Sequence, residues 1–189
     1  MPLSQTLPKS VAEYTDQLFF GIFSQTPHSA ISVFLTRHVP TLLKKPQTEG
    51  TWTAYPPNYI QEPTFQMVTN GYVFYKHPYF ELPFKSGQLA ITQKIYAEER
   101  WIENIQDIKL WFDFDNEEDA KKAFNKLVTF FSGLDTTPKI TCNNGVDYAV
   151  FADKNESKYY SCIQLRMAKD NFTIGNYRLL FEIVEDMDE

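Results

Sequence analysis

Apolar residues recur at helical spacing near the start of the chain. Ser10 and Glu13 form a capping box, in which the serine hydroxyl accepts from the Glu13 amide and the glutamate carboxylate reaches back. Apolar positions three and four residues apart follow, so the pattern predicts a first helix and then a second one. Pro40 is expected to break the second helix because proline lacks a backbone donor. Residues 30–35 also fit a strand. Residues 1–45 are thus predicted to form a helical N-terminal part.

Alternation of apolar and polar residues begins after a connecting segment. Residues 46–63 contain four prolines and little periodicity, which predicts a loop. Asn70-Gly71 lies between two apolar runs and is typical of a two-residue hairpin turn. Lys85-Ser86-Gly87 predicts a second turn, which leads into a strand over 88–96. In the next predicted strand, 105–114, the side chains on one face are all apolar, and Trp111 lies on the opposite face from Leu110 and Phe112.

The clearest helical pattern covers residues 117–132. Asp115 or Asn116 is expected to cap this helix, and three acidic residues occupy its first turn, where the helix dipole is positive. Gly133 stands where a helix commonly ends. A single apolar stripe runs along the segment, which indicates a helix that packs with one face on a sheet.

Four strand candidates complete the chain, separated by short turns. Short turns favour antiparallel pairing, because parallel strands need long crossover connections. The fold class is therefore predicted to be α+β, as one domain over residues 1–189. It has N-terminal helices and, over 64–189, an antiparallel sheet with one amphipathic helix packed across it and a C-terminal four-strand meander. The candidate strands are 139–142, 147–152, 158–168 and 177–184.

The two cysteines occupy predicted strands. Parity places Cys142 with Ile140 and predicts that it faces the core, whereas Cys162 is predicted to face away, so a disulfide between the two is not expected. The N-terminal residues do not have the charge and apolar pattern of a secretory signal. Together these features predict a cytoplasmic protein with reduced thiols.

Charge and hydropathy exclude two classes of partner. The chain has 18 Lys and Arg against 24 Asp and Glu, a formal net charge of −6, which argues against binding to a nucleic-acid backbone. The longest apolar run, Leu18 to Phe23, is far shorter than the roughly 20 residues of a membrane span. We therefore expect no nucleic-acid partner and no membrane insertion.

Motifs for common catalytic chemistry are missing from the sequence. It contains neither a phosphate-binding loop nor a dinucleotide-binding glycine pattern, and its three histidines are scattered, so no cofactor and no metal are expected. His77, with Glu81 nearby, is a weak candidate for a general base. The pair Asp113 and Asp115 could hold a divalent cation, but the residues that follow favour a helix cap instead.

Aromatic residues make up 16% of the chain, which is its most unusual feature. Tyr and Trp suit half-buried positions at protein interfaces, so we expect a non-catalytic protein-binding protein with an acidic, aromatic surface. It would act as an inhibitor or immunity-type protein on a basic partner, or as an adaptor in an assembly. The alternatives are a small-molecule binder or enzyme with an aromatic-lined cavity, and a structural subunit that pairs with copies of itself. The candidate interface residues are Trp101, Trp111, Asp113, Tyr160 and Arg166.

Overall fold

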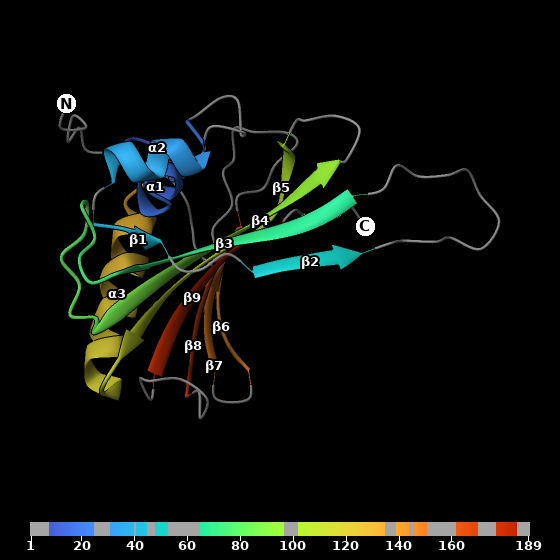
Figure 1. Ribbon diagram of the computed structural model, residues 1–189. Helices are drawn as coiled ribbons and strands as arrows, with labels where there is room; N and C mark the ends of the chain where they lie inside the picture. The colour runs from blue at the N-terminus through green and yellow to red at the C-terminus, as the bar shows by residue number, and fades with distance from the viewer. Residues whose placement is uncertain are drawn as a thin grey trace, which may run out of the picture.

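The computed structural model shows three helices and nine strands in the part of the chain that it describes (Figure 1). The described residues are 8–24, 31–39, 41–44, 48–52, 65–96, 102–134, 139–143, 146–150, 162–169 and 177–184. The helices are α1 (Val11–Leu18), α2 (Ile31–His38) and α3 (Glu117–Ser132). The strands are β1 (Leu43–Lys44), β2 (Thr48–Trp52), β3 (Phe65–Phe74), β4 (Ser86–Tyr96), β5 (Ile102–Phe114), β6 (Lys139–Asn143), β7 (Val146–Val150), β8 (Cys162–Lys169) and β9 (Tyr177–Val184).

All nine strands belong to one antiparallel sheet. Their order is β1-β3-β4-β5-β9-β8-β7-β6, and β2 pairs with β3 beside β1. The predicted α+β class with an antiparallel sheet is confirmed. The strands after α3 lie next to one another in chain order, and β9 joins them to β5 in the centre of the sheet.

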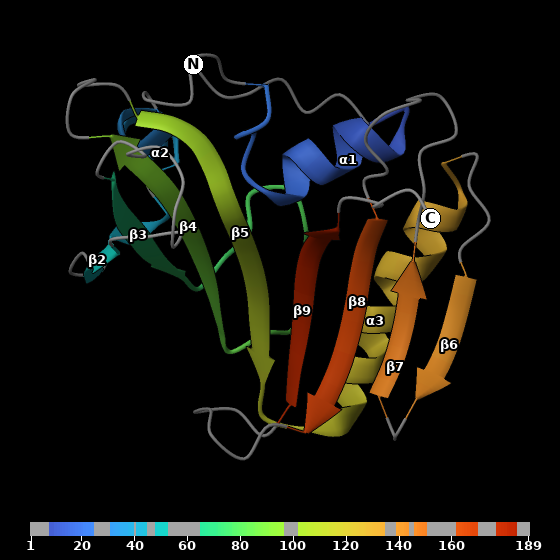
Figure 2. The ribbon, with the colours of Figure 1, turned by 90° about the vertical axis from the view of Figure 1, so that its right-hand side faces the viewer.

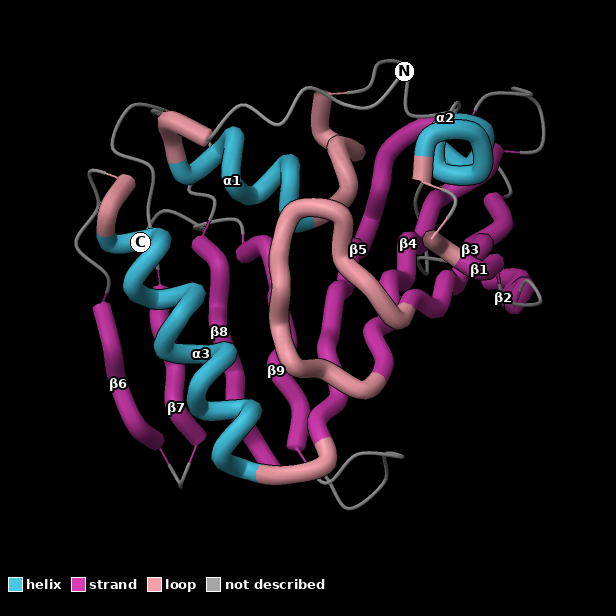
Figure 3. Tube along the Cα trace, turned by 90° about the vertical axis from the view of Figure 1, so that its left-hand side faces the viewer, coloured by secondary structure: helices cyan, strands magenta, loops and turns pink. Residues whose placement is uncertain are grey.

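The described helices lie over one face of the sheet (Figures 1 and 3). We call this the helix face, and the opposite one, seen toward the viewer in Figure 2, the helix-free face. Apolar side chains of all three helices pack with alternate strand residues into one buried cluster that includes Phe112 and Phe181. None of the helices in the described part of the chain has the length and apolar character needed to cross a membrane.

Helix α3 begins and ends where the sequence pattern predicts. The side chain of Asn116 caps it by accepting a hydrogen bond from the Asp119 amide at 2.8 Å. Its apolar stripe packs over β9 and the neighbouring strands β5 and β8. The stripe consists of the buried residues Ala120, Ala123, Phe124, Leu127 and Phe131.

Helix α1 is shorter than its apolar pattern suggests. The Glu13 amide donates to the Ser10 hydroxyl at 3.1 Å, while the Glu13 carboxylate accepts from the Lys9 amide at 2.6 Å. The helix ends at Leu18, because Phe20 and Gly21 have φ values of 62° and 79° and turn the chain away from the helix axis. The apolar residues after Leu18 therefore reach the core from a turn.

The predicted hairpin at Asn70-Gly71 is wrong. Strand β3 runs unbroken through both residues, with Asn70 opposite Ile91 and Gly71 opposite Ala90. Because β4 is long enough to pair with every residue of β3, the backbone groups of this dipeptide are satisfied in the ladder. The connection between the two strands lies in residues 75–85 instead.

Two further expectations for this half of the chain are corrected. Thr48–Trp52, inside the predicted connecting loop 46–63, forms β2 and pairs with β3. Ser86 and Gly87 open β4 and do not form a turn. Gly87 is needed for packing, since a Cβ atom there would stand 2.2 Å from the ring of Phe74.

The predicted burial of Cys142 is also wrong. Its strand register places it opposite Asp147, and Ile140 opposite the buried Ala149, so parity assigns it to the helix face as expected. However, Cys142 is exposed, because β6 is the last strand of the sheet and has a neighbouring strand on one side only among the described residues. β7 separates β6 from the strand of Cys162, and this spacing of about 10 Å is too wide for a disulfide.

Candidate functional site

The helix-free face carries the aromatic residue that sequence parity singled out. Trp111 of β5 stands between Gln88 of β4 and Leu180 of β9. Residues directly opposite in an antiparallel ladder project to the same side, so these three side chains share the helix-free face. The neighbours Leu110 and Phe112 point the other way and are fully buried. Trp111 itself is partly exposed.

Arg178 of β9 organises the surroundings of Trp111. Its guanidinium lies over the indole, 5.2 Å from the ring centroid, in the arrangement of a cation–π contact. Its Nε donates to the carboxylate of Asp113 at 2.8 Å, and Ser86 Oγ donates to the same carboxylate at 3.4 Å. Asp113 is 1% exposed, so its charge is neutralised inside the protein. We call Ser86, Trp111, Asp113 and Arg178 the Trp111 cluster.

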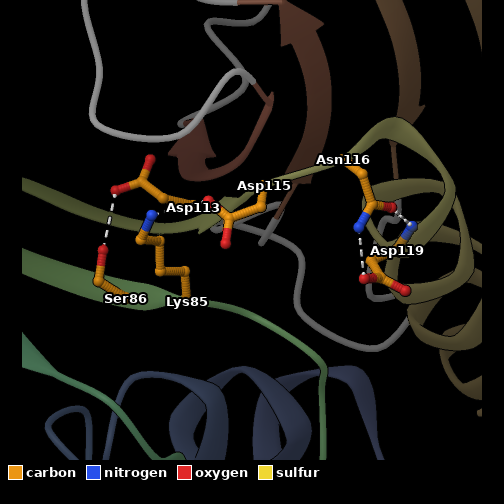
Figure 4. Close-up of polar contacts among 6 residues, drawn as sticks. All are labelled: Lys85, Ser86, Asp113, Asp115, Asn116 and Asp119. Carbon is orange, nitrogen blue, oxygen red and sulfur yellow. Dashed lines mark hydrogen bonds and ion pairs between the residues drawn. The ribbon is translucent and has the colours of Figure 1, made fainter.

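The two carboxylates that could have held a cation have separate partners (Figure 4). Asp113 belongs to the Trp111 cluster, whereas the exposed Asp115 pairs with Lys85 at 2.8 Å. Asn116 Nδ2 donates to Asp119 at 2.8 Å, which completes the cap of α3. In the described part of the chain, no three His, Cys, Asp or Glu side chains converge as metal ligands do.

His77 lies inside the protein, between the turn after α1 and the sheet. Its side chain is 7% exposed and is surrounded by phenylalanine rings, with Phe20 and Phe80 centred 4.6 and 4.9 Å away. Nε2 lies 2.9 Å from the carbonyl oxygen of Leu18, and Nδ1 accepts from the Tyr79 amide at 3.2 Å. The neutral Nε2–H tautomer satisfies both contacts.

Burial lowers the pKa of His77 to about 4, and the bond to the Leu18 carbonyl opposes this shift only in part. The imidazole is therefore neutral near pH 7, with both nitrogens occupied by the backbone. Glu81 is exposed, and its carbonyl oxygen accepts from Lys126 Nζ at 2.8 Å. These contacts favour a structural role for His77, as a link between α1 and the 75–85 connection.

Of the three remaining candidate residues, the structure describes only Arg166. Trp101 and Tyr160 lie outside the described residues. Arg166 occupies β8 opposite Leu180 of β9, which puts its backbone position one strand further from Trp111. Arg178 and Ser86 were missed by the sequence analysis, although the alternation around the buried Leu179 already assigns Arg178 to the opposite face.

Exposed acidic residues of the described part gather at the start of α3. Glu117 and Glu118 pair with Lys121 and Lys122 at 2.6 and 2.7 Å, in i,i+4 ion pairs. Such exposed pairs contribute little to stability, but they balance the local charge. The Trp111 cluster is likewise internally neutral, so it offers an aromatic surface rather than an acidic one.

The Trp111 cluster is chemically suited to binding. It presents an indole and a guanidinium, the residue types that anchor protein interfaces, on the helix-free face, and the carboxylate of Asp113 balances the arginine charge. The chain was compared with known protein families, curated proteins and solved structures, and none of them matched it.

Proposed function

We propose that this chain is a non-catalytic protein-binding protein, an inhibitor or an adaptor, that docks the helix-free face of its sheet on another protein. The observation that supports this most is the one-sided cover of the sheet: the described helices pack on one face, and Trp111 stays partly exposed on the other. The stacked arginine holds the indole in a fixed orientation, which lowers the entropy lost on binding.

Charge and cysteine geometry support the rest of the proposal. A net charge of −6 favours a basic partner through long-range attraction, with Trp111 as the central contact. The exposed thiol of Cys142 suits a reducing compartment such as the cytoplasm. The alternative of an aromatic-lined cavity with His77 and Glu81 at its mouth has less support, because the backbone occupies both imidazole nitrogens.

Site-specific photo-crosslinking in cells tests this function. A benzoylphenylalanine at Gln88, beside Trp111, should form a covalent adduct with a second polypeptide. The same group at Asn125, on the exposed side of α3, is the matched control and should give none. Equal labelling from both positions, or no adduct from position 88 in a folded chain, would overturn the proposal.

A second variant tests whether the indole is the anchor. Trp111→Ala should weaken binding of the identified partner about 30-fold or more, as truncation of a central aromatic contact does. Tyr75→Ala, which removes an aromatic side chain that is 61% exposed, is the control and should change the affinity much less. A partner that binds both variants equally well would exclude the Trp111 cluster as its docking site.

A further inference from the structure

The outer edge of β6 lacks a neighbouring strand among the described residues. β6 ends the sheet order, and all five of its residues pair with β7 on the inner side (Figure 2). Successive residues of a strand direct their backbone groups alternately to the two edges, so the outer edge presents donors and acceptors without a ladder. Such an edge is a template for another extended chain.

Apolar side chains accompany this edge. Ile140 is 57% exposed and Cys142 is exposed as well, two residues apart on the helix face. Ile140 stands opposite Ala149 of β7, and the register continues across β8 to Phe181 of β9; both Ala149 and Phe181 are fully buried. The apolar row of the helix face thus extends to the sheet edge, while α3 packs over β5, β8 and β9.

We propose that β6 pairs with β6 of a second copy of this chain, antiparallel and around a two-fold axis at Thr141. This arrangement turns two sheets into one continuous sheet with both helix layers on the same side. It completes the backbone ladder of both edges without a change in either fold.

A second copy fits this edge because β6 is complementary to itself. In the proposed register Ile140 of each copy stands opposite Cys142 of the other, so the two exposed apolar pairs cover each other. Lys139 stands opposite Asn143, and no like charges face across the axis. Because Ile140 and Cys142 are both exposed, the helix layer leaves this edge accessible to the second copy.

Disulfide trapping tests the register. Residues directly opposite in such a pair have Cα atoms about 4.5–5.5 Å apart, within the range that a disulfide spans. With Cys142→Ser as background, Thr141→Cys should therefore give a covalent dimer under mild oxidation. Asn143→Cys in the same background is the control, because its two copies lie four residues apart along the strands and should not cross-link. Equal cross-linking of both variants, or of neither, would overturn the register.

Sedimentation at micromolar concentration tests the pairing itself. Ile140→Lys should raise the dimer dissociation constant about 30-fold, because each dimer loses two buried isoleucines. Leu43→Lys is the matched control: Leu43 is also 57% exposed, but it lies on β1 at the other side of the sheet. A wild-type chain that stays monomeric, or a dimer indifferent to Ile140→Lys, would overturn the proposal.

The dimer proposal and the proposed function can be refuted independently of each other. Trp111→Ala should leave the dimer intact, because Trp111 belongs to β5 and the helix-free face. Thermal unfolding of Ile140→Lys should match that of Leu43→Lys, which would show that loss of the dimer does not reflect a damaged monomer. A large drop in the melting temperature of Ile140→Lys alone, measured below the dissociation constant, would instead show that Ile140 supports the monomer fold and would count against the interface.

Discussion

His77 makes the stability of the protein sensitive to acid in a way that one substitution can remove. In the folded state its imidazole is buried, donates to the Leu18 carbonyl at 2.9 Å and accepts from the Tyr79 amide. Burial lowers its pKa from 6.5 to about 4. We therefore consider His77→Gln, which keeps a side chain with one donor and one acceptor but does not titrate in this range.

The sign and size of the effect follow from the two pKa values. Because the folded pKa lies below the unfolded one, the unfolded chain binds the proton first as the pH falls below 6.5. The free energy of unfolding therefore decreases between pH 6.5 and 4, and the loss is complete below pH 4. With 1.36 kcal/mol per pKa unit, His77 alone removes about 2 kcal/mol of stability between pH 7 and pH 5.

Urea unfolding at pH 7 and pH 5 measures this contribution. His77→Gln should be less stable at pH 7, since glutamine does not reproduce both hydrogen bonds, but it should lose about 2 kcal/mol less than the wild type on going to pH 5. Asn125→Gln changes an exposed residue of α3 that does not titrate, and it should parallel the wild-type curve. If His77→Gln were as acid-sensitive as the wild type, the buried neutral imidazole would not be the cause.

Three further substitutions test the packing. Asn116→Ala removes the cap of α3 and should lower the free energy of unfolding by about 1 kcal/mol in urea titrations. Gly87→Ala places a methyl group against the ring of Phe74 and should cost about 1–3 kcal/mol; an unchanged urea midpoint would contradict the contact. Tyr14→Phe removes a fully buried hydroxyl for which the described residues offer no hydrogen-bond partner, and it should raise stability by about 1 kcal/mol, whereas a loss would reveal a partner for that hydroxyl.

Local sequence signals were sufficient to predict the bounds of α3 and the two faces of β5. The cap, the acidic first turn and the apolar stripe of α3 all lie within one short segment, so the sequence alone indicates its bounds. Alternation along β5 likewise separates Trp111 from Leu110 and Phe112, and the structure shows these residues on opposite faces. Features of this kind depend on neighbours in the sequence.

Features that depend on distant partners were mispredicted or missed. Asn70-Gly71 has the composition of a turn, but a long β4 draws it into a ladder opposite Ile91 and Ala90. The ion pair between Asp113 and Arg178 joins residues 65 positions apart, and no local pattern indicates it. The sequence could identify Trp111 as an outward residue, but it could not show the guanidinium stacked on its ring.

The proposed docking face and the proposed dimer edge are both surfaces that the helix layer leaves uncovered. Helix α3 packs over β9, β5 and β8, whereas Ile140 and Cys142 of the edge strand β6 stay exposed. Because the described helices share one face, the other face keeps Trp111 partly exposed for the same reason. A partner on the helix-free face and a second copy along β6 would each cover surface that the chain's own helix layer does not, and they could bind at the same time, since the two surfaces belong to different faces and strands.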